Sequence, residues 1–253
     1  MPAATKKEQI AELMDQGFVV ARGLASAALC ANLRELGERE LLNPQAPLEY
    51  EADLRYPGAP ASRAEPGGRT VRRLLDAYAR DPAYAQWATS RDIRSWMETY
   101  FGQSVALSRA HHNCLMTKHP TYGSLTGWHR DARYWSFERD DLVSAWLALG
   151  PETVENGALW LVPGSHRIAF DAERFDADKF FRADMPANQA LISRAVSPAL
   201  QAGDVVFFHC NTLHSAGQNL TEQIKYSLVF TYHGLSNAPQ PGTRSTSKPE
   251  VLL

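Results

Sequence analysis

Residues 203–219, GDVVFFHCNTLHSAGQN, indicate a fold built from short strands, because apolar runs alternate here with turn residues. Two strands are predicted within this stretch, over 204–210 and 214–217. Working outward from it, we predict further strands over residues 104–118, 126–131, 142–149, 157–162 and 223–233. Many short strands separated by Gly, Pro and Asn favour a β-sandwich or a barrel.

The chain before residue 103 is expected to be mainly helical. Residues 6–15 form the first predicted helix, and an apolar strand follows over 18–21. Apolar spacing and cap residues predict later helices after Ser26, around 71–78, and over 93–100 between Ser90 and Gly102. Residues 43–69 carry Pro and Gly with little periodicity, so we expect a surface loop. The helices would pack against the strands as a buttress.

Length and composition favour one globular domain. The chain has 253 residues, of which 44% are hydrophobic and 21% charged, as in ordinary globular proteins. We expect a single domain over 1–235, with the helical buttress in 1–102 and the β core in 103–235. Residues 236–253 are rich in Pro, Ser and Thr and are expected to form a flexible tail.

Charge and targeting signals indicate which partners to expect. The net charge is −2, so nothing in it suggests nucleic acid or an anionic membrane as a partner. The first residues, MPAATKKEQIAEL, lack the apolar region of a signal peptide, and no apolar run reaches membrane-spanning length. Cys30, Cys114 and Cys210 form no CxxC pair and are expected to be buried thiols. A cytoplasmic protein acting on a small molecule is expected.

The segment GWHRD, residues 127–131, carries the strongest chemical signal. On a strand, side chains two residues apart point to the same face, so His129 and Asp131 can offer a nitrogen and a carboxylate oxygen to one ion. His214 is the preferred third ligand, and His209, at the end of an apolar run, is its competitor. Two histidines and one carboxylate leave half of the coordination positions of an octahedrally coordinated ion free, which is typical of non-haem iron(II) oxygenases.

Three longer stretches show a family resemblance: GWHRD, then SAWLALGPETVENGALWLVPGSHR (144–167), then GDVVFFHCNTLHSAGQN (203–219). Together with the opening MDQGFVVARGLAS, they resemble the phytanoyl-CoA dioxygenase family of iron(II)- and 2-oxoglutarate-dependent oxygenases, over roughly residues 8–233. The resemblance implies a double-stranded β-helix core, that is, a cupin-like jelly-roll. It also implies that His129, Asp131 and His214 bind iron(II), with 2-oxoglutarate as cosubstrate and O2 as oxidant.

The resemblance also assigns cosubstrate and substrate contacts. Lys225 stands eleven positions after His214, where an arginine usually holds the distal carboxylate of 2-oxoglutarate. A lysine offers that carboxylate a point charge in place of a bidentate fork. Ala216 occupies a position that often carries a hydroxyl. The other expected contacts are Trp146 and His112 for the cosubstrate, and Arg130, Tyr134 and Trp135 for the substrate.

The expected reaction is hydroxylation of a small organic molecule, with succinate and CO2 as co-products. Three alternatives stay open at this point. A non-redox cupin-like isomerase or binding module would keep the three ligands without needing Lys225. A hydrolase that uses zinc-bound water would also suit three protein ligands with one open position. A degenerate family member would bind metal without turnover. Residues 168–198 are expected to form a lid or substrate wall.

Overall fold

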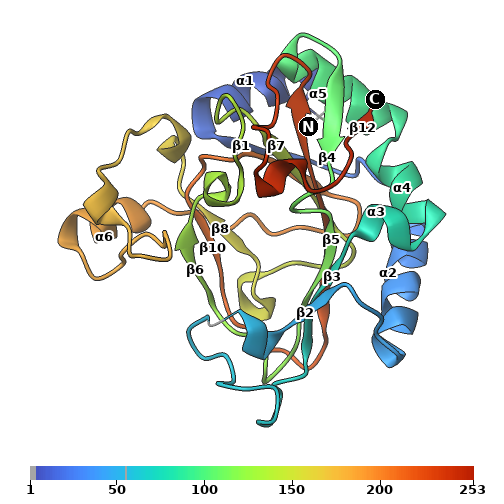
Figure 1. The fold of residues 1–253 in the computed structure, drawn as a ribbon, viewed down its shortest axis with the longest axis vertical. Coiled ribbons are helices and arrows are strands. Elements are labelled where there is room, and N and C mark those ends of the chain that lie inside the picture. Colours follow the sequence, from blue (N-terminus) through green and yellow to red (C-terminus); the bar gives the residue numbers. More distant parts are fainter. Residues whose placement is uncertain (1–3, 55) are drawn as a thin grey trace.

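The computed structural model describes residues 4–54 and 56–253, so residues 1–3 of the expected domain and residue 55 of the expected loop lie outside it. A large antiparallel sheet faces a smaller one (Figure 1). The path of the large sheet runs in the order β1 (Phe18–Ala21), β9 (Val205–His209), β7 (Val143–Ala148), β11 (Lys225–Gly234), β5 (Cys114–Lys118), β3 (Val71–Leu75) and β2 (Leu48–Tyr50). The small sheet has the order β6 (Thr126–His129), β10 (His214–Ala216) and β8 (Leu159–Leu161).

Helices cover the outer face of the large sheet: α1 (Lys6–Gln16), α2 (Ala27–Leu42), α3 (Ala77–Arg80), α4 (Pro82–Ala88) and α5 (Arg91–Phe101). A further helix, α6 (Pro186–Ile192), lies apart from them (Figure 1). Short 3-10 turns are η1 (Glu51–Asp53), η2 (Asp131–Tyr134), η3 (Val154–Asn156), η4 (Ser165–Arg167), η5 (Ala172–Arg174) and η6 (Arg244–Thr246). The caps expected at Ser26 and Ser90 accept backbone N–H groups, and Gly102 ends α5 in the left-handed conformation.

The central strands β7 and β9 are buried on both faces, which explains their largely apolar sequences. In β9, Val205 and Phe207 pack under the helices, whereas Val206 and Phe208 face the small sheet. Leu161 of β8 packs in the same inner cluster as Val206 and Phe208. This alternation follows from the two-residue period of a strand. The expected jelly-roll core buttressed by N-terminal helices is confirmed.

The helix predicted around 71–78 is wrong, because residues 71–75 form strand β3 and only Ala77–Arg80 are helical. Val71 and Leu74 are both in the cluster beneath the helices, a three-residue spacing that mimics a helix face. A shift in the pairing with β2 causes this spacing: Glu49 faces Arg73 but Tyr50 faces Val71, so Arg72 is an extra residue. A β-bulge of this kind changes which side chains share a face.

Three other expectations need correction. The strand predicted over 104–118 is two strands, β4 (Val105–Ser108) and β5, separated by a turn in which His112 has a φ of 42°. The loop expected over 43–69 contains β2 and η1. The segment 236–253, expected to be flexible, holds η6 and β12 (Val251–Leu252), and β12 pairs with β4. A free strand edge accepts such a segment whatever its composition.

Within the described residues, no helix combines the length and the apolar character needed to cross a bilayer. The insert expected as a lid, residues 168–198, contains η5 and α6 and lies to one side of the small sheet (Figure 1).

The helix–sheet contact predicts a large effect of one core substitution. Phe207 is fully buried and its ring stacks on Trp96 of α5, with 3.7 Å between centroids. Replacing Phe207 with Ala should lower the free energy of unfolding by about 3–5 kcal/mol, since a cavity remains where the ring was. Denaturant unfolding measures this loss. Leu42→Ala on the exposed end of α2 is the control, and equal effects of the two variants would contradict the packing described here.

Candidate metal centre

Three side chains converge at one end of the small sheet. His129 ends β6 and pairs directly with His214, the first residue of β10, so the two rings lie 4.3 Å apart between centroids. Asp131 begins η2, and a single residue separates it from the end of β6. One ligand atom from each of the three residues lies within 4.8 Å of the others. The structure therefore brings together the three residues that the sequence singled out.

The two imidazoles are held in one orientation by the backbone. His129 donates from Nδ1 to the carbonyl of Gly127 at 2.8 Å, and His214 donates from Nδ1 to Thr212 at 2.9 Å. Each Nε2 is left facing Asp131, with Oδ1 at 3.6 Å from His129 and 3.4 Å from His214. A hydrogen bond donated by the ring nitrogen that does not bind the metal fixes the tautomer and direction of a metal-binding histidine.

Electrostatics favours the metal-binding protonation state of two of the three side chains, His129 and Asp131. Burial, with His214 nearby, lowers the pKa of His129 to about 4, so this imidazole is neutral at pH 7. Burial alone would raise the pKa of Asp131, but His112, His214 and the contact with His129 bring it well below its ordinary value. For His214, burial opposes protonation while Asp131 favours it, and its pKa lies above the ordinary value. A neutral imidazole and an ionised carboxylate are the forms that bind metals.

The donor set fits a divalent metal ion. Asp131 is 1% exposed, yet its Oδ1 has no hydrogen-bond partner among the described residues. An unpartnered buried carboxylate oxygen carries a desolvation cost that a bound cation removes. Two nitrogens and one carboxylate oxygen approach from one side, which is the arrangement that suits iron(II) with open coordination positions.

A cavity between the two sheets extends from this centre. Leu159, Phe208 and Val229 line its walls, and its far end is basic, with Arg72, Lys118 and Lys225. All three cations are buried. Because an unpaired charge is costly in such a place, the partner of each cation decides how much positive charge is available to a ligand.

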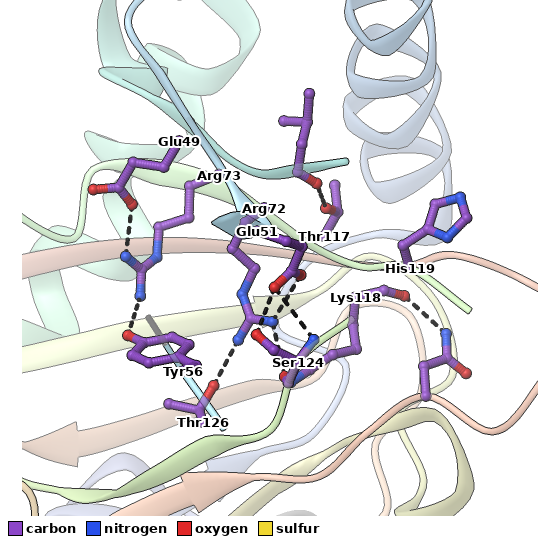
Figure 2. Close-up of polar contacts among 12 residues, drawn as sticks. Glu49, Glu51, Tyr56, Arg72, Arg73, Thr117, Lys118, His119, Ser124 and Thr126 are labelled. Atoms are coloured by element: carbon purple, nitrogen blue, oxygen red, sulfur yellow. Dashed lines mark hydrogen bonds and ion pairs between the residues drawn. The ribbon is translucent and has the colours of Figure 1, made fainter. Parts of the chain in front are cut away.

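Arg72 and its neighbour already have carboxylate partners (Figure 2). Arg72 lies 3.1 Å from the fully buried Glu51 and donates to the hydroxyl of Thr126 at 2.6 Å. Arg73 pairs with Glu49 at 2.7 Å. These ion pairs fix β3 against β2 and the loop before β6, and they leave no net charge.

Lys225 is compensated in the same way. Its Nζ lies 2.9 Å from Glu152 Oε2, while Glu152 Oε1 accepts hydrogen bonds from Trp146 Nε1 at 3.0 Å and from Ser227 at 2.7 Å. Glu152 is fully buried. The lysine expected to anchor the cosubstrate therefore carries its own counter-ion, and Trp146 contacts that counter-ion.

Lys118 differs from the other cations of the cavity. Its ammonium donates to the carbonyl of Ser124 at 2.8 Å, and within the described residues no carboxylate lies within ion-pair distance of it. Burial, together with the positive charges of Arg72 and Lys225, lowers the pKa of Lys118 well below its ordinary value. An incoming carboxylate would relieve both effects.

His112 and Tyr134 lie beside the centre, as expected for site residues. His112 Nε2 is 3.5 Å from Asp131 Oδ1, and the Tyr134 ring lies 6.1 Å from the His129 ring. From the insert, the Phe180 ring lies 5.9 Å from His129, and Phe181 donates its N–H to Trp128. Part of residues 168–198 therefore forms a wall next to the centre.

Three other residues that the sequence suggested for the site lie away from the metal centre and its cavity. Arg130 donates to the carbonyls of Ser165 and Ile168 and lies outside the cavity lining. Trp135 packs in a small cluster with Phe137, Leu142 and Cys210. His209 lies near Asp141, at 3.8 Å, outside the group that includes His214.

Sequence reasoning missed Arg72 and Lys118 as cavity residues, and it missed Glu152 as the counter-ion of Lys225. Arg72 was assigned to a helix, and Glu152 stands in a turn-rich stretch with no signal of its own. Lys118 gave a usable signal, because residues 112, 116 and 118 share one face of the predicted strand.

Comparison with curated proteins finds relatives of low identity but long coverage. The ectoine dioxygenase of Sphingopyxis alaskensis is 24% identical over 93% of this chain and 78% of its own length. Human peroxisomal phytanoyl-CoA dioxygenase is 26% identical over 85% of this chain and 64% of its own length.

Solved structures show the same fold. The epimerase SnoN, described in complex with Fe3+, alpha ketoglutarate and nogalamycin RO, superposes with a TM-score of 0.76 at 23% identity, covering 96% of this chain and 90% of SnoN. EctD from S. alaskensis in its apoform has a TM-score of 0.74 at 23% identity, covering 92% of this chain and 78% of EctD.

The family model described as phytanoyl-CoA dioxygenase (PhyH) matches residues 13–227, which is most of the chain. The fold and this match agree with the resemblance found in the sequence. The chain belongs to the phytanoyl-CoA dioxygenase family and is an iron- and 2-oxoglutarate-dependent dioxygenase.

Proposed function

We propose that this enzyme hydroxylates a small organic molecule, with His129, Asp131 and His214 as its iron ligands. The observation that carries the proposal is the convergence of their ligand atoms within 4.8 Å around an unpartnered buried carboxylate oxygen. Iron and 2-oxoglutarate supply the oxidising chemistry with dioxygen, giving succinate and CO2 as co-products. The protein orients the ligands, binds the cosubstrate and excludes bulk water from the space between the sheets.

Charge balance supports a role for Lys118 in cosubstrate binding. Iron(II) and the Asp131 carboxylate leave one positive charge, and 2-oxoglutarate brings two negative charges. Lys118 supplies the remaining positive charge, because Arg72 and Lys225 are already paired with Glu51 and Glu152. We therefore assign the distal carboxylate of 2-oxoglutarate mainly to Lys118, with Lys225 beside it. A buried charge that meets its counter-ion avoids a large desolvation cost.

Trp146 and His112 would act as positioning residues. The indole N–H of Trp146 holds Glu152, which in turn holds Lys225. His112 lies against the Asp131 carboxylate and so limits its rotation. Of the residues expected to contact the substrate, Tyr134 keeps that role in this proposal, whereas Arg130 and Trp135 make structural contacts.

Relatives named for ectoine and phytanoyl-CoA act on small molecules, and the proposal extends this substrate class to the present enzyme. A cytoplasmic location is part of the proposal. It is supported by Cys30, Cys114 and Cys210, which are all unpaired and buried.

The iron ligands are tested by anaerobic titration with iron(II) and 2-oxoglutarate. The parent protein should develop a visible charge-transfer band, and His129→Ala and His214→Ala should abolish it because each removes a nitrogen ligand. His209→Ala is the matched control and should retain the band, since His209 lies outside the cluster. Loss of the band in His209→Ala with retention in His214→Ala would overturn the assignment. Turnover that requires neither dioxygen nor 2-oxoglutarate would favour the zinc hydrolase or the isomerase.

The same band measures cosubstrate affinity. Lys118→Met should weaken 2-oxoglutarate binding by about tenfold or more, which corresponds to about 1.4 kcal/mol. Lys7→Met, at an exposed position on α1, is the control and should bind as the parent does. Unchanged affinity in Lys118→Met would contradict the charge balance described above.

Glu152 gives an opposite prediction. Glu152→Gln keeps the shape of the side chain but removes the counter-ion of Lys225, so that the ammonium becomes available to the cosubstrate. The variant should bind 2-oxoglutarate more tightly than the parent in the same titration. Because a buried ion pair is broken, its free energy of unfolding should fall by about 3–5 kcal/mol. Weaker 2-oxoglutarate binding in a folded Glu152→Gln variant would contradict this prediction. It would mean that cosubstrate binding requires the intact ion pair between Lys225 and Glu152.

A further inference from the structure

A second cavity, of about 310 Å³, adjoins the metal centre. It shares Arg73 and His112 with the first cavity, and Tyr134 also lines it. Its volume is in the range of small-molecule sites in proteins. Because His112 contacts Asp131 and lines both cavities, a molecule in the second cavity would lie next to the metal ligands.

Positive charge exceeds negative charge around this second cavity. Two carboxylates line it, Glu49 and Asp76, and four basic side chains do so: Arg73, Arg109, Arg244 and Lys248. Glu49 pairs with Arg73 at 2.7 Å. Asp76 is shared by Arg109 at 3.2 Å and Lys248 at 2.8 Å. Among the described residues, Arg244 has no ion-pair partner.

Polar groups in the lining also lack partners. His111 Nε2 and Arg109 Nε are buried from solvent, and neither has a hydrogen-bond partner in the part of the chain that the structure describes. The His111 ring is held edge-on against Trp135, with 5.0 Å between centroids. Burial, with Arg244 nearby, lowers the pKa of His111 to about 3, so the ring is neutral and its Nε2 is available for a hydrogen bond.

The C-terminal segment forms one side of this cavity. Arg244, Ser247 and Lys248 all belong to it. The segment is held in place at several points: β12 pairs with β4, Glu250 contacts His233 at 2.7 Å, and Ser245 accepts the N–H of Ser136 at 2.9 Å. The excess positive charge therefore stands on a fixed part of the structure.

We propose that the second cavity binds an oxyanion group of the substrate, a carboxylate or a phosphate. Arg244, Arg109 and Lys248 provide charge and His111 provides a hydrogen bond, so that the rest of the substrate extends past His112 toward the metal centre. This inference rests on the proposed function and adds the substrate class to it. An excess of positive charge in a partly enclosed site attracts anions and raises their local concentration.

The test uses three probes with one aromatic ring and different head groups: phenyl phosphate, benzoate and neutral benzyl alcohol. The full-length protein is loaded with manganese(II) in excess 2-oxoglutarate, so that the first cavity is filled. Paramagnetic relaxation of the probe nuclei then reports binding close to the metal. The nuclei of phenyl phosphate, of benzoate or of both should show a relaxation enhancement that saturates as the protein sites fill. Benzyl alcohol should show no such enhancement. Relaxation of one anion alone would identify the head group as phosphate or carboxylate.

Substitution separates this cavity from the metal itself. Arg244→Gln should weaken the probe's binding by about fivefold or more, whereas a probe bound directly to manganese would not respond. Arg244 is exposed, so the variant should fold. The control is Arg91→Gln, at an exposed position on α5, which should bind as the parent does.

The inference is overturned if neither anion shows relaxation that saturates with its concentration. It is also overturned if the parent protein and Arg244→Gln bind the probe with equal affinity. A metal-free portion of the same purified protein, titrated with iron(II) and 2-oxoglutarate, separates failure of the oxyanion site from failure of the proposed function. A normal band without anion binding would refute the oxyanion site alone, and a missing band would refute the proposed function.

Discussion

The centre depends on the register between β6 and β10. His129 and His214 come from distant parts of the chain, yet antiparallel pairing sets them opposite each other at the end of the small sheet. A shift of one residue in either strand would turn one imidazole to the other face. Carbonyl groups of Gly127 and Thr212 then fix both rings, so backbone geometry determines where the two nitrogens point.

Around this centre, buried charges are mostly neutralised within the protein. Glu51, Glu49 and Glu152 each hold a cation that lines the first cavity. The pairs tie the inner strands together, and they reduce the number of charges that respond to a ligand. Lys118 in one cavity and Arg244 in the next stand out because no described carboxylate balances them. The two proposals, 2-oxoglutarate binding in the first cavity and oxyanion binding in the second, rest on these two cations.

Much of this arrangement was predictable from sequence. Strands buried on one or both faces, the caps at Ser26 and Ser90, and the HxD pair leave local patterns. The bulge at Arg72 and the pairing of β12 with β4 leave none, since both depend on what lies across the sheet. For the same reason, the sequence named Lys225 as an anchor but could not show that Glu152 already neutralises it.

The number of imidazoles around bound iron tests the central claim most directly. X-ray absorption of the protein loaded anaerobically with iron(II) counts them through their multiple-scattering signal. The account predicts two imidazoles, from His129 and His214, with His112 remaining outside the coordination sphere. A spectrum that requires one imidazole, or three, would contradict the geometry on which the account rests.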